Sequence, residues 1–419
     1  MPRRWSPPRV FYGWWVVGAC FIVALYMGGV IFYGFTAVFE PIAAEFGWSY
    51  AQISLAASLR GLEVGLLTPV VGMLVDRWGP RRLIFGGVVI GSLGLMLLSQ
   101  TGSLGVFYAA FILMAIGMSC TGSTVMMTAV ANWFRRRVAL ATGIMICGYG
   151  SGGLLVPLVV QLIDLYGWRM MVVILALGLL TVGLPLSLVV RHKPEQYGYL
   201  PDGERGQIAG GDGVSATPQT KEVDIGAREA MKGSVFWKIT LGLMPKFIAV
   251  VTVVTHVMPY LSSIGVARAT SGLVATAIPL LSIGGRLGFG WLGDRLDKRR
   301  LAAGALGLVA LGLLCFELTP LVGAELLVPF FILFGLGYGG SLTMAGALPR
   351  EYFGRTSFGT IVGFIWGIGI LGTLVGPPLA GWVFDHWGSY QGVWLALAGL
   401  AIGGAVIMAL LPPAGSAKS

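Results

Sequence analysis

The chain has 419 residues, of which 56% are hydrophobic and only 11% are charged, and its mean hydropathy is +0.83. Soluble proteins carry about 25% charged residues, so the composition excludes a soluble fold and indicates a protein with several membrane spans. The net charge of +10 does not indicate nucleic-acid binding, because most basic residues fall in short loops and tails between apolar segments, where positive charge sets membrane orientation.

Apolar segments of the length needed to cross a bilayer, about 20 residues, recur along the chain. We expect twelve spans, with the limits 11–39, 50–74, 82–101, 104–132, 137–163, 169–190, 236–262, 269–292, 300–318, 324–349, 356–384 and 389–412. The intervening stretch 191–235 is polar and rich in Gly, Asp and Pro, which is typical of a linker.

These segments predict an all-α membrane protein with 12 transmembrane helices in two six-helix bundles. The expected units are residues 1–190, the cytoplasmic linker 191–235, and residues 236–419 with a short cytoplasmic tail.

Basic residues are concentrated on one alternate set of loops, which holds Arg3, Arg4, Arg9, Arg77, Arg81, Arg82, Arg135, Arg136, Arg137, Arg295, Lys298, Arg299, Arg300, Arg350 and Arg355. The other set holds only Arg169 and Arg268. Because positive loops stay inside, we expect both termini in the cytoplasm and the protein in the inner, cytoplasmic membrane of the cell.

The two halves repeat each other. GMLVDR (72–77) before Arg81 corresponds to GWLGDR (290–295) before Arg299 at an offset of 218, and FILMAIGM (111–118) corresponds to FILFGLGY (331–338) at an offset of 220. Such internal repeats are typical of secondary transporters, in which two halves move around a central site.

GMLVDRWGPRR and GWLGDRLDKRR resemble the paired loop signatures of the major facilitator superfamily over the whole chain. We interpret the residues of these motifs as gating groups, with the carboxylates accepting hydrogen bonds from a neighbouring helix end and the arginines pairing across the cytoplasmic face. This set comprises Asp76, Arg77, Arg81, Asp294, Arg295 and Arg299.

A finer resemblance is to monocarboxylate porters and their oxalate/formate-type bacterial relatives. It rests on Trp133-Phe134 and the arginines that follow, on the glycines 143, 148 and 152, and on Tyr12-Gly-Trp-Trp. The resemblance implies a secondary active transporter of small organic anions, foremost monocarboxylates, that works by alternating access.

Three cations and one acid lie deep in apolar segments: Arg60, Lys246, Arg286 and Glu63. A charge at the bilayer centre costs about 2.5–3.5 kcal/mol, so such residues usually line a pathway. Arg286 matches the helix 8 arginine of the porters and offers a fork suited to a carboxylate. The aspartate that stands one turn earlier in the eukaryotic pattern is replaced by Ser282, so the proton relay proposed for that pair does not carry over.

The remaining site residues are expected around this arginine. Lys246 is a second anion ligand, although the family lysines on helices 1 and 11 are absent. Arg60 and Glu63 share a helix face, either as a structural pair or as a coupling element, and His256 is a second candidate for protons. Aromatic residues are expected to supply hydroxyls or an apolar lid, namely Tyr33, Tyr149, Tyr338 and Trp366.

Several alternatives stay open. The chain is either a proton symporter or an anion exchanger, and its cargo is a monocarboxylate, a dicarboxylate or an inorganic anion such as nitrate or nitrite. A more remote alternative is a receptor that binds a ligand without transporting it. We expect no enzyme or cofactor, because no nucleophile–base constellation or nucleotide-binding loop is visible in the sequence. We expect no metal site, because the cysteines at 20, 120, 147 and 315 lack the spacing of metal ligands.

Overall fold

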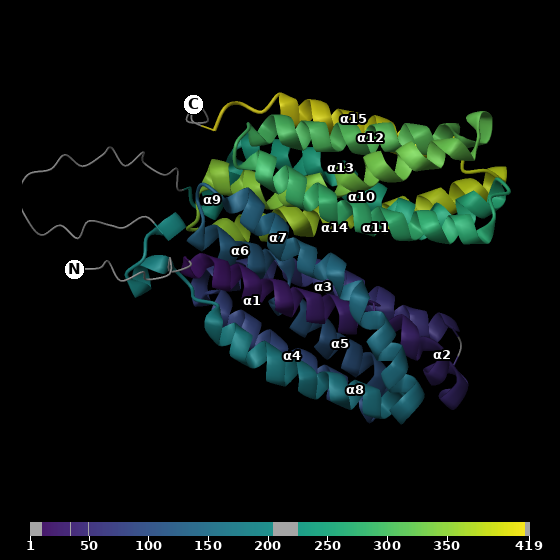
Figure 1. The fold of residues 1–419 in the computed structure, drawn as a ribbon, viewed down its shortest axis with the longest axis horizontal. Coiled ribbons are helices and arrows are strands. Elements are labelled where there is room, and N and C mark those ends of the chain that lie inside the picture. Colours follow the sequence, from purple (N-terminus) through teal and green to yellow (C-terminus); the bar gives the residue numbers. More distant parts are fainter. Residues whose placement is uncertain (1–10, 34, 49, 204–224, 415–419) are drawn as a thin grey trace, which may run out of the picture.

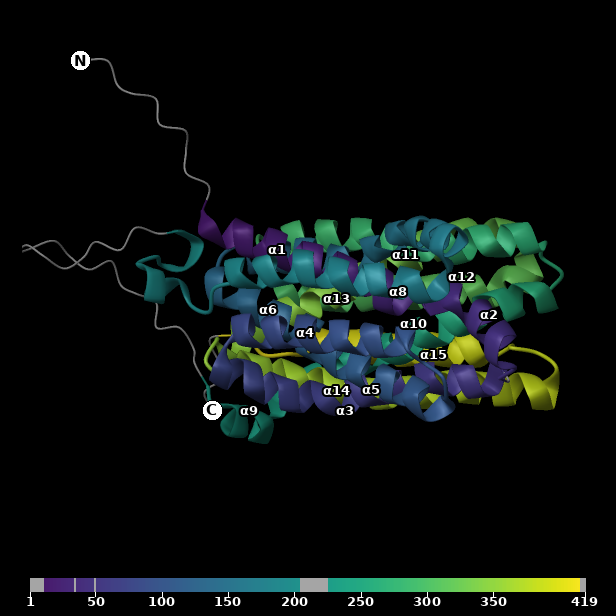
Figure 2. The ribbon, with the colours of Figure 1, turned by 90° about the horizontal axis from the view of Figure 1, so that it is seen from below.

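The computed structural model describes residues 11–414 except 34, 49 and 204–224, and a few side chains within these limits are not described, among them Tyr33 and Arg60. Every regular element among the described residues is a helix. The helices run along one long axis and form two bundles, which lie against each other at one end and diverge toward the other (Figure 1). The view from below shows the same common direction (Figure 2).

The first bundle contains the elements up to α8. They are α1 (Tyr12–Met27), the π-helix η1 (Gly28–Tyr33), α2 (Phe35–Phe46), α3 (Tyr50–Trp78), α4 (Pro80–Ser99), α5 (Leu104–Cys120), α6 (Ser123–Trp133), α7 (Val138–Ser151), η2 (Gly152–Leu155) and α8 (Val156–Val189). Within α8, Gly167 has a φ of 76°, a conformation that glycine adopts without steric cost, and two spans meet there.

The second bundle follows a connecting region. That region contains η3 (Pro194–Tyr197), η4 (Pro201–Gly203) and α9 (Ala227–Lys232). The bundle comprises α10 (Ser234–Ser263), α11 (Arg268–Gly293), α12 (Lys298–Val322), η5 (Ala324–Leu326), α13 (Leu327–Phe353), α14 (Phe358–Trp387) and α15 (Val393–Ala409). The exact limits of the two units and of the linker stay predictions.

The expected twelve spans are recovered from these helices. Nine described stretches are long and apolar enough to cross a membrane, and one of them, 138–189, holds two spans on either side of Gly167. The short apolar helix α15 supplies another. The remaining span is α3, which carries Arg60, Glu63, Asp76 and Arg77 and is therefore the most polar of the set.

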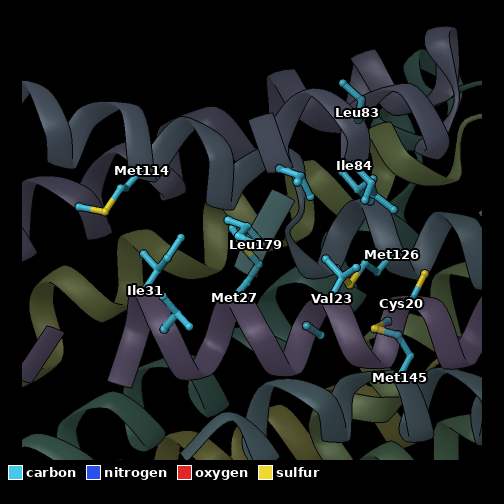
Figure 3. Close-up of a cluster of buried hydrophobic side chains, with 14 of the residues drawn as sticks. Cys20, Val23, Met27, Ile31, Leu83, Ile84, Met114, Met126, Met145 and Leu179 are labelled. Atoms are coloured by element: carbon cyan, nitrogen blue, oxygen red, sulfur yellow. The ribbon is translucent and has the colours of Figure 1, made fainter. Parts of the chain in front are cut away.

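Each bundle has its own apolar core. Figure 3 shows part of the first, where side chains from α1, α4, α5, α6, α7, α8 and η1 converge. The labelled residues are Cys20, Val23, Met27, Ile31, Leu83, Ile84, Met114, Met126, Met145 and Leu179. Because lipid tails are as apolar as these side chains, close packing rather than hydrophobicity holds membrane helices together. This close packing makes each bundle compact.

The bundles are joined at one end, which we call the closed end. Asp76, in the last turn of α3, accepts hydrogen bonds from the backbone N–H groups of Gly359 (2.9 Å) and Thr360 (2.7 Å) and from the Thr360 hydroxyl (2.6 Å). Gly359 and Thr360 begin α14 of the second bundle. A carboxylate is stabilised there because the first N–H groups of a helix lack partners within the helix and carry partial positive charge.

Asp294, which follows α11, makes the reciprocal contact. It accepts hydrogen bonds from the N–H groups of Ala139 (2.8 Å) and Leu140 (3.1 Å) at the start of α7 in the first bundle. Burial raises the pKa of Asp294, and the two N–H donors act against that shift. The donor residues of the two helices correspond at an offset of 220, since 139 and 140 match 359 and 360, so the contact has the same pseudo-symmetry as the sequence repeat.

Arg350 also joins the two bundles at this end, and Arg355 joins the second bundle to the connecting region. Arg350, near the end of α13, is only 5% exposed, and its Nε donates to the carbonyl of Ala131 (3.0 Å) in the last turn of α6. Arg355 forms an ion pair with Glu195 of the connecting region (2.6 Å). A cation at a helix C-terminus is favourable because the carbonyls there lack partners.

The motif arginines of the second half behave differently from expectation, because they pair within the second bundle. Arg299 forms hydrogen bonds with Asp297, two residues away, and with the carbonyl of Leu411, while Arg295 stacks on Trp291 at 3.8 Å. Asp297, which caps α12, lies two residues from Arg299 and binds its guanidinium, so among the described residues this guanidinium has its hydrogen-bond partners in the second bundle. Arg77 and Arg81 are exposed at the closed end.

We expect Asp76→Asn and Asp294→Asn each to weaken the closed end. The amide keeps one acceptor oxygen but removes the charge that interacts with the helix N-terminus, an effect of about 1 kcal/mol, so the melting temperature in detergent falls by about 2–4 °C. Asp164→Asn, at an exposed position of α8, is the control. Melting temperatures that stay at the control value for both variants would contradict the assignment.

Candidate functional site

Arg286 lies on α11 against the first bundle. Its side chain is 4% exposed, and its Nη1 donates a hydrogen bond to the backbone carbonyl of Ile146 on α7 (2.9 Å). The Nε of the same guanidinium has no hydrogen-bond partner among the residues that the structure describes. Nη1 of this buried cation is therefore fixed by the Ile146 carbonyl, and its Nε–H can donate a hydrogen bond to a ligand.

Small residues on α7 allow this approach. A Cβ at Gly143 would lie 2.5 Å from the backbone oxygen of Arg286, and a Cβ at Gly150 would lie 2.6 Å from its Nη1. Because real Cβ atoms essentially never approach other atoms this closely, the two glycines let α11 and its arginine rest on α7. Gly143, one of the glycines that carry the family resemblance, therefore has a direct steric role here.

Lys246 lies on α10 and is 2% exposed. Within the described part of the chain its Nζ has no hydrogen-bond partner, and it lies 4.3 Å from the ring centre of Phe247 and 5.1 Å from that of Trp366. The aromatic faces attract the cation, but they do not replace the hydrogen bonds that it gives up on leaving water. Lys246 is also near enough to Arg286 for the two cations to repel each other.

Trp366, on α14, adds a third donor. Its Nε1 is buried without a partner, and its ring packs against apolar residues of both bundles. Arg286, Lys246 and Trp366 thus come from three helices of the second bundle and present polar hydrogens that no group of the described residues accepts. Buried polar groups are normally paired, so the arrangement is suited to an anion that supplies the acceptors.

The other predicted side chains lie at different distances from this cluster. Tyr338 lies next to Arg286, with its ring centre 5.8 Å from the guanidinium carbon. The hydroxyl of Tyr149 points into the first bundle and donates to the carbonyl of Thr121 (2.7 Å). Tyr338 is therefore placed to contact a ligand of Arg286, whereas the hydroxyl of Tyr149 is already used in packing.

The predicted coupling residues are only partly described. Glu63 is half-buried on α3, but the side chains of Arg60 and Tyr33 lie outside the described part of the structure, so the expected pair and the expected aromatic contact stay predictions. His256 shares hydrogen bonds of 3.0 Å with the hydroxyl of Tyr390 and with the carbonyl of Pro377. It joins α10 to α14 and to the segment before α15.

An apolar pocket lies elsewhere, inside the first bundle between η1, α2, α4, α5 and α8. Its lining includes Leu95, Met114 and Leu175 and is apolar throughout. A pocket of this kind offers no group for an anion, so we place the site at the buried cations instead.

One participant was not predicted, the backbone carbonyl of Ile146. The sequence signals available for it were the glycines around it on α7 and the lack of an acid near Arg286 on helix 8. Backbone acceptors leave no residue-type signature, and only the structure shows that α7 and α11 meet at this depth.

The model of the Major Facilitator Superfamily matches residues 19–321 and 247–419, and the chain belongs to this superfamily. Among curated proteins, it is 28% identical to "Monocarboxylate transporter 12" of Mus musculus, over 95% of this chain and 84% of the relative. It is 27% identical to "Monocarboxylate transporter 11" of Homo sapiens, over 99% of this chain and 86% of the relative.

Solved structures show the same fold at low identity. The proton:xylose symporter XylE matches with a TM-score of 0.73 at 13% identity, over 96% of both chains. The transporter FucP in an outward conformation matches with a TM-score of 0.71 at 14% identity, over 96% of this chain and 98% of the other. The predicted fold class is confirmed, and the chain is a multi-pass membrane transporter, as expected, and not an enzyme.

We expect Lys246→Met to stabilise the protein in a buffer that contains no anion able to bind to the site. A buried donor without a partner costs about 1–3 kcal/mol of stability. The substitution removes this cost and also removes the repulsion between Lys246 and Arg286. Thermal unfolding in detergent measures the effect, and Lys238→Met, at an exposed position of the same helix, is the control. A lower melting temperature for Lys246→Met than for Lys238→Met would show that Lys246 has a structural partner.

Proposed function

We propose that this protein is a secondary transporter that binds small organic anions, foremost monocarboxylates, between its two bundles. The observation that carries the proposal is the cluster of three buried donors without acceptors, on Arg286, Lys246 and Trp366. Two of them are cations, and the electrostatic cost of burying both falls when an anion binds. The printed names of the curated relatives, monocarboxylate transporters, support the same substrate class.

A monocarboxylate fits this chemistry. The Nε edge of Arg286 binds a carboxylate with two parallel hydrogen bonds, and Lys246 and Trp366 donate to the remaining lone pairs of the same two oxygen atoms. Tyr338, beside the guanidinium, contacts the apolar part of a short acid. A neutral sugar leaves both cations uncompensated, and a cationic ligand adds a third positive charge.

Transport by alternating access follows from the two bundles. The loops at the closed end are the positively charged set, so the closed end is cytoplasmic, with both termini there, and the structure is outward-facing. The protein then resides in the cytoplasmic membrane. Moving the cargo inward requires the contacts of Asp76, Asp294 and Arg350 to break.

The coupling of transport to protons is assigned to Glu63 on α3, with His256 as a second candidate. A half-buried carboxylate becomes neutral more readily as it loses water, so it can carry a proton with the anion. The sequence predicts a pair between Glu63 and Arg60, and such a pair makes proton uptake by Glu63 depend on whether Arg60 binds the anion. Exchange of one anion for another is the alternative, and it needs no titrating group.

We expect lactate to stabilise the purified protein against heating. A ligand that binds only the folded state stabilises it by about 2.7 kcal/mol at 100 times its dissociation constant. Arg286→Ala loses this stabilisation, and Lys246→Met, which keeps the guanidinium, loses part of it. A thermal-shift series with lactate, oxalate and nitrate, on the wild type and both variants, measures it.

The series also separates the alternatives. Stabilisation by oxalate above lactate favours a dicarboxylate exchanger, and stabilisation by nitrate alone favours an inorganic anion porter. If lactate stabilises Arg286→Ala as well as it stabilises the wild type, the site assignment is wrong. Counterflow of labelled lactate in proteoliposomes distinguishes a transporter from a receptor, which binds without turnover.

We expect Glu63→Gln to abolish proton-driven accumulation while leaving counterflow intact. The amide cannot take up a proton, but counterflow needs no net proton movement. Uptake of labelled lactate into proteoliposomes with an acidic exterior tests this, with Glu325→Gln, at an exposed position of η5, as the control. Accumulation by Glu63→Gln at the wild-type level would exclude Glu63 as the coupling group.

A further inference from the structure

Among the described residues, one nitrogen atom of the Arg286 guanidinium has a hydrogen-bond partner. Nη1 donates to the Ile146 carbonyl at 2.9 Å, and Nε has no partner within the described part of the chain. In a guanidinium group, Nε and Nη2 form one edge and Nη1 lies on the other side. The contact with Ile146 therefore leaves free the edge that binds a carboxylate with two parallel hydrogen bonds.

The holding contact comes from the other bundle. Arg286 belongs to α11 of the second bundle, whereas Ile146 and Gly150 belong to α7 of the first. Along the same pair of helices, Gly143 lies against the backbone of Arg286, and Cys147 Sγ lies 4.0 Å from the carbonyl of Ile283. The orientation of Arg286 thus depends on close contact between α7 and α11.

Gly150 is the residue that makes this orientation sterically feasible. All three heavy atoms nearest to an added Cβ belong to the guanidinium of Arg286, with Nη1 at 2.6 Å, Cζ at 3.3 Å and Nη2 at 3.5 Å. A methyl group there presses first on the end of a flexible side chain. Because alanine is also a better helix former than glycine, the substitution leaves α7 intact and moves only the arginine.

We propose that Gly150 and the Ile146 carbonyl on α7 are positioning groups that orient the Arg286 fork for a carboxylate, so that the anion site is complete only while the closed end is closed. The inference rests on the proposed function, because it assigns the substrate carboxylate to Arg286. When α7 and α11 separate at the closed end, the fork loses its anchor and binds the carboxylate less well. Separation of α7 and α11 therefore promotes release of the anion on the side of the closed end.

The experiment compares a planar anion with a spherical one. In Gly150→Ala the positive charge stays but the fork is misaligned, so the dissociation constant for lactate rises about tenfold, which corresponds to about 1.4 kcal/mol. Binding of bromide, which needs only the charge, changes little. Both constants are measured by calorimetric titration of the full-length protein in detergent, and lactate counterflow is expected to show a raised KM with its maximal rate retained.

Two glycine variants serve as comparisons. Gly153→Ala, in η2, meets no atom within 4 Å and is expected to bind both anions like the wild type. Gly143→Ala forces a methyl group against the Arg286 backbone oxygen, so it lowers the melting temperature as well as lactate affinity, whereas Gly150→Ala lowers affinity alone.

Each failure has its own signature. If Gly150→Ala keeps wild-type affinity for lactate while Arg286→Ala loses it, the positioning role is wrong and the proposed function stands. If Gly150→Ala weakens lactate and bromide by the same factor, the glycine acts on packing and the proposal is overturned. If Arg286→Ala binds lactate like the wild type, the proposed function fails first.

Discussion

The burial of two positive charges, with no neutralising partner among the described residues, is the constraint on which the rest of this molecule depends. Lys246 and Arg286 are nearly inaccessible and close enough to repel each other, and each buried ion costs several kcal/mol even after relaxation. Such an arrangement lowers stability and persists where function requires it. The helices around it are packed to tolerate this cost, and an anionic cargo is the group that removes it.

The interface between the bundles supports this arrangement largely through backbone groups. Asp76 and Asp294 bind helix N-termini, Arg350 binds a helix C-terminus, and Arg286 binds a carbonyl in the middle of a helix. Contacts of charged side chains with helix ends are individually modest, so they can be broken in turn. A closed end built from such contacts suits a transporter that must open and close repeatedly.

Much of the fold could be predicted from the sequence because it follows from local rules. Hydrophobic length gave the spans, and the repeated motifs gave the two-bundle architecture and the helix-end contacts of Asp76 and Asp294. The expected limits 137–163 and 169–190 placed a break where Gly167 interrupts α8. The extension of the first span through α2 to Phe46 was not predicted, since an apolar sequence does not indicate where a helix ends.

The site was predictable in its charges but not in its partners. Arg286 and Lys246 stood out as cations in apolar segments, and Trp366 was placed near them. The Ile146 carbonyl could not be foreseen, because every residue has one, and neither could the direction of the Tyr149 hydroxyl, which depends on tertiary packing. The expectation that Arg299 reaches across the bundles did not anticipate that Asp297 would capture it.

The central claim is that the uncompensated cations form the anion site, and a structure with a heavy-atom ligand tests it most directly. Crystals grown with 3-bromopropionate locate the ligand through the anomalous signal of bromine. The account predicts one bromine peak between the bundles, with the carboxylate on Arg286 and within hydrogen-bond distance of Lys246 or Trp366. A ligand bound elsewhere, with these three donors still unpaired, would contradict it.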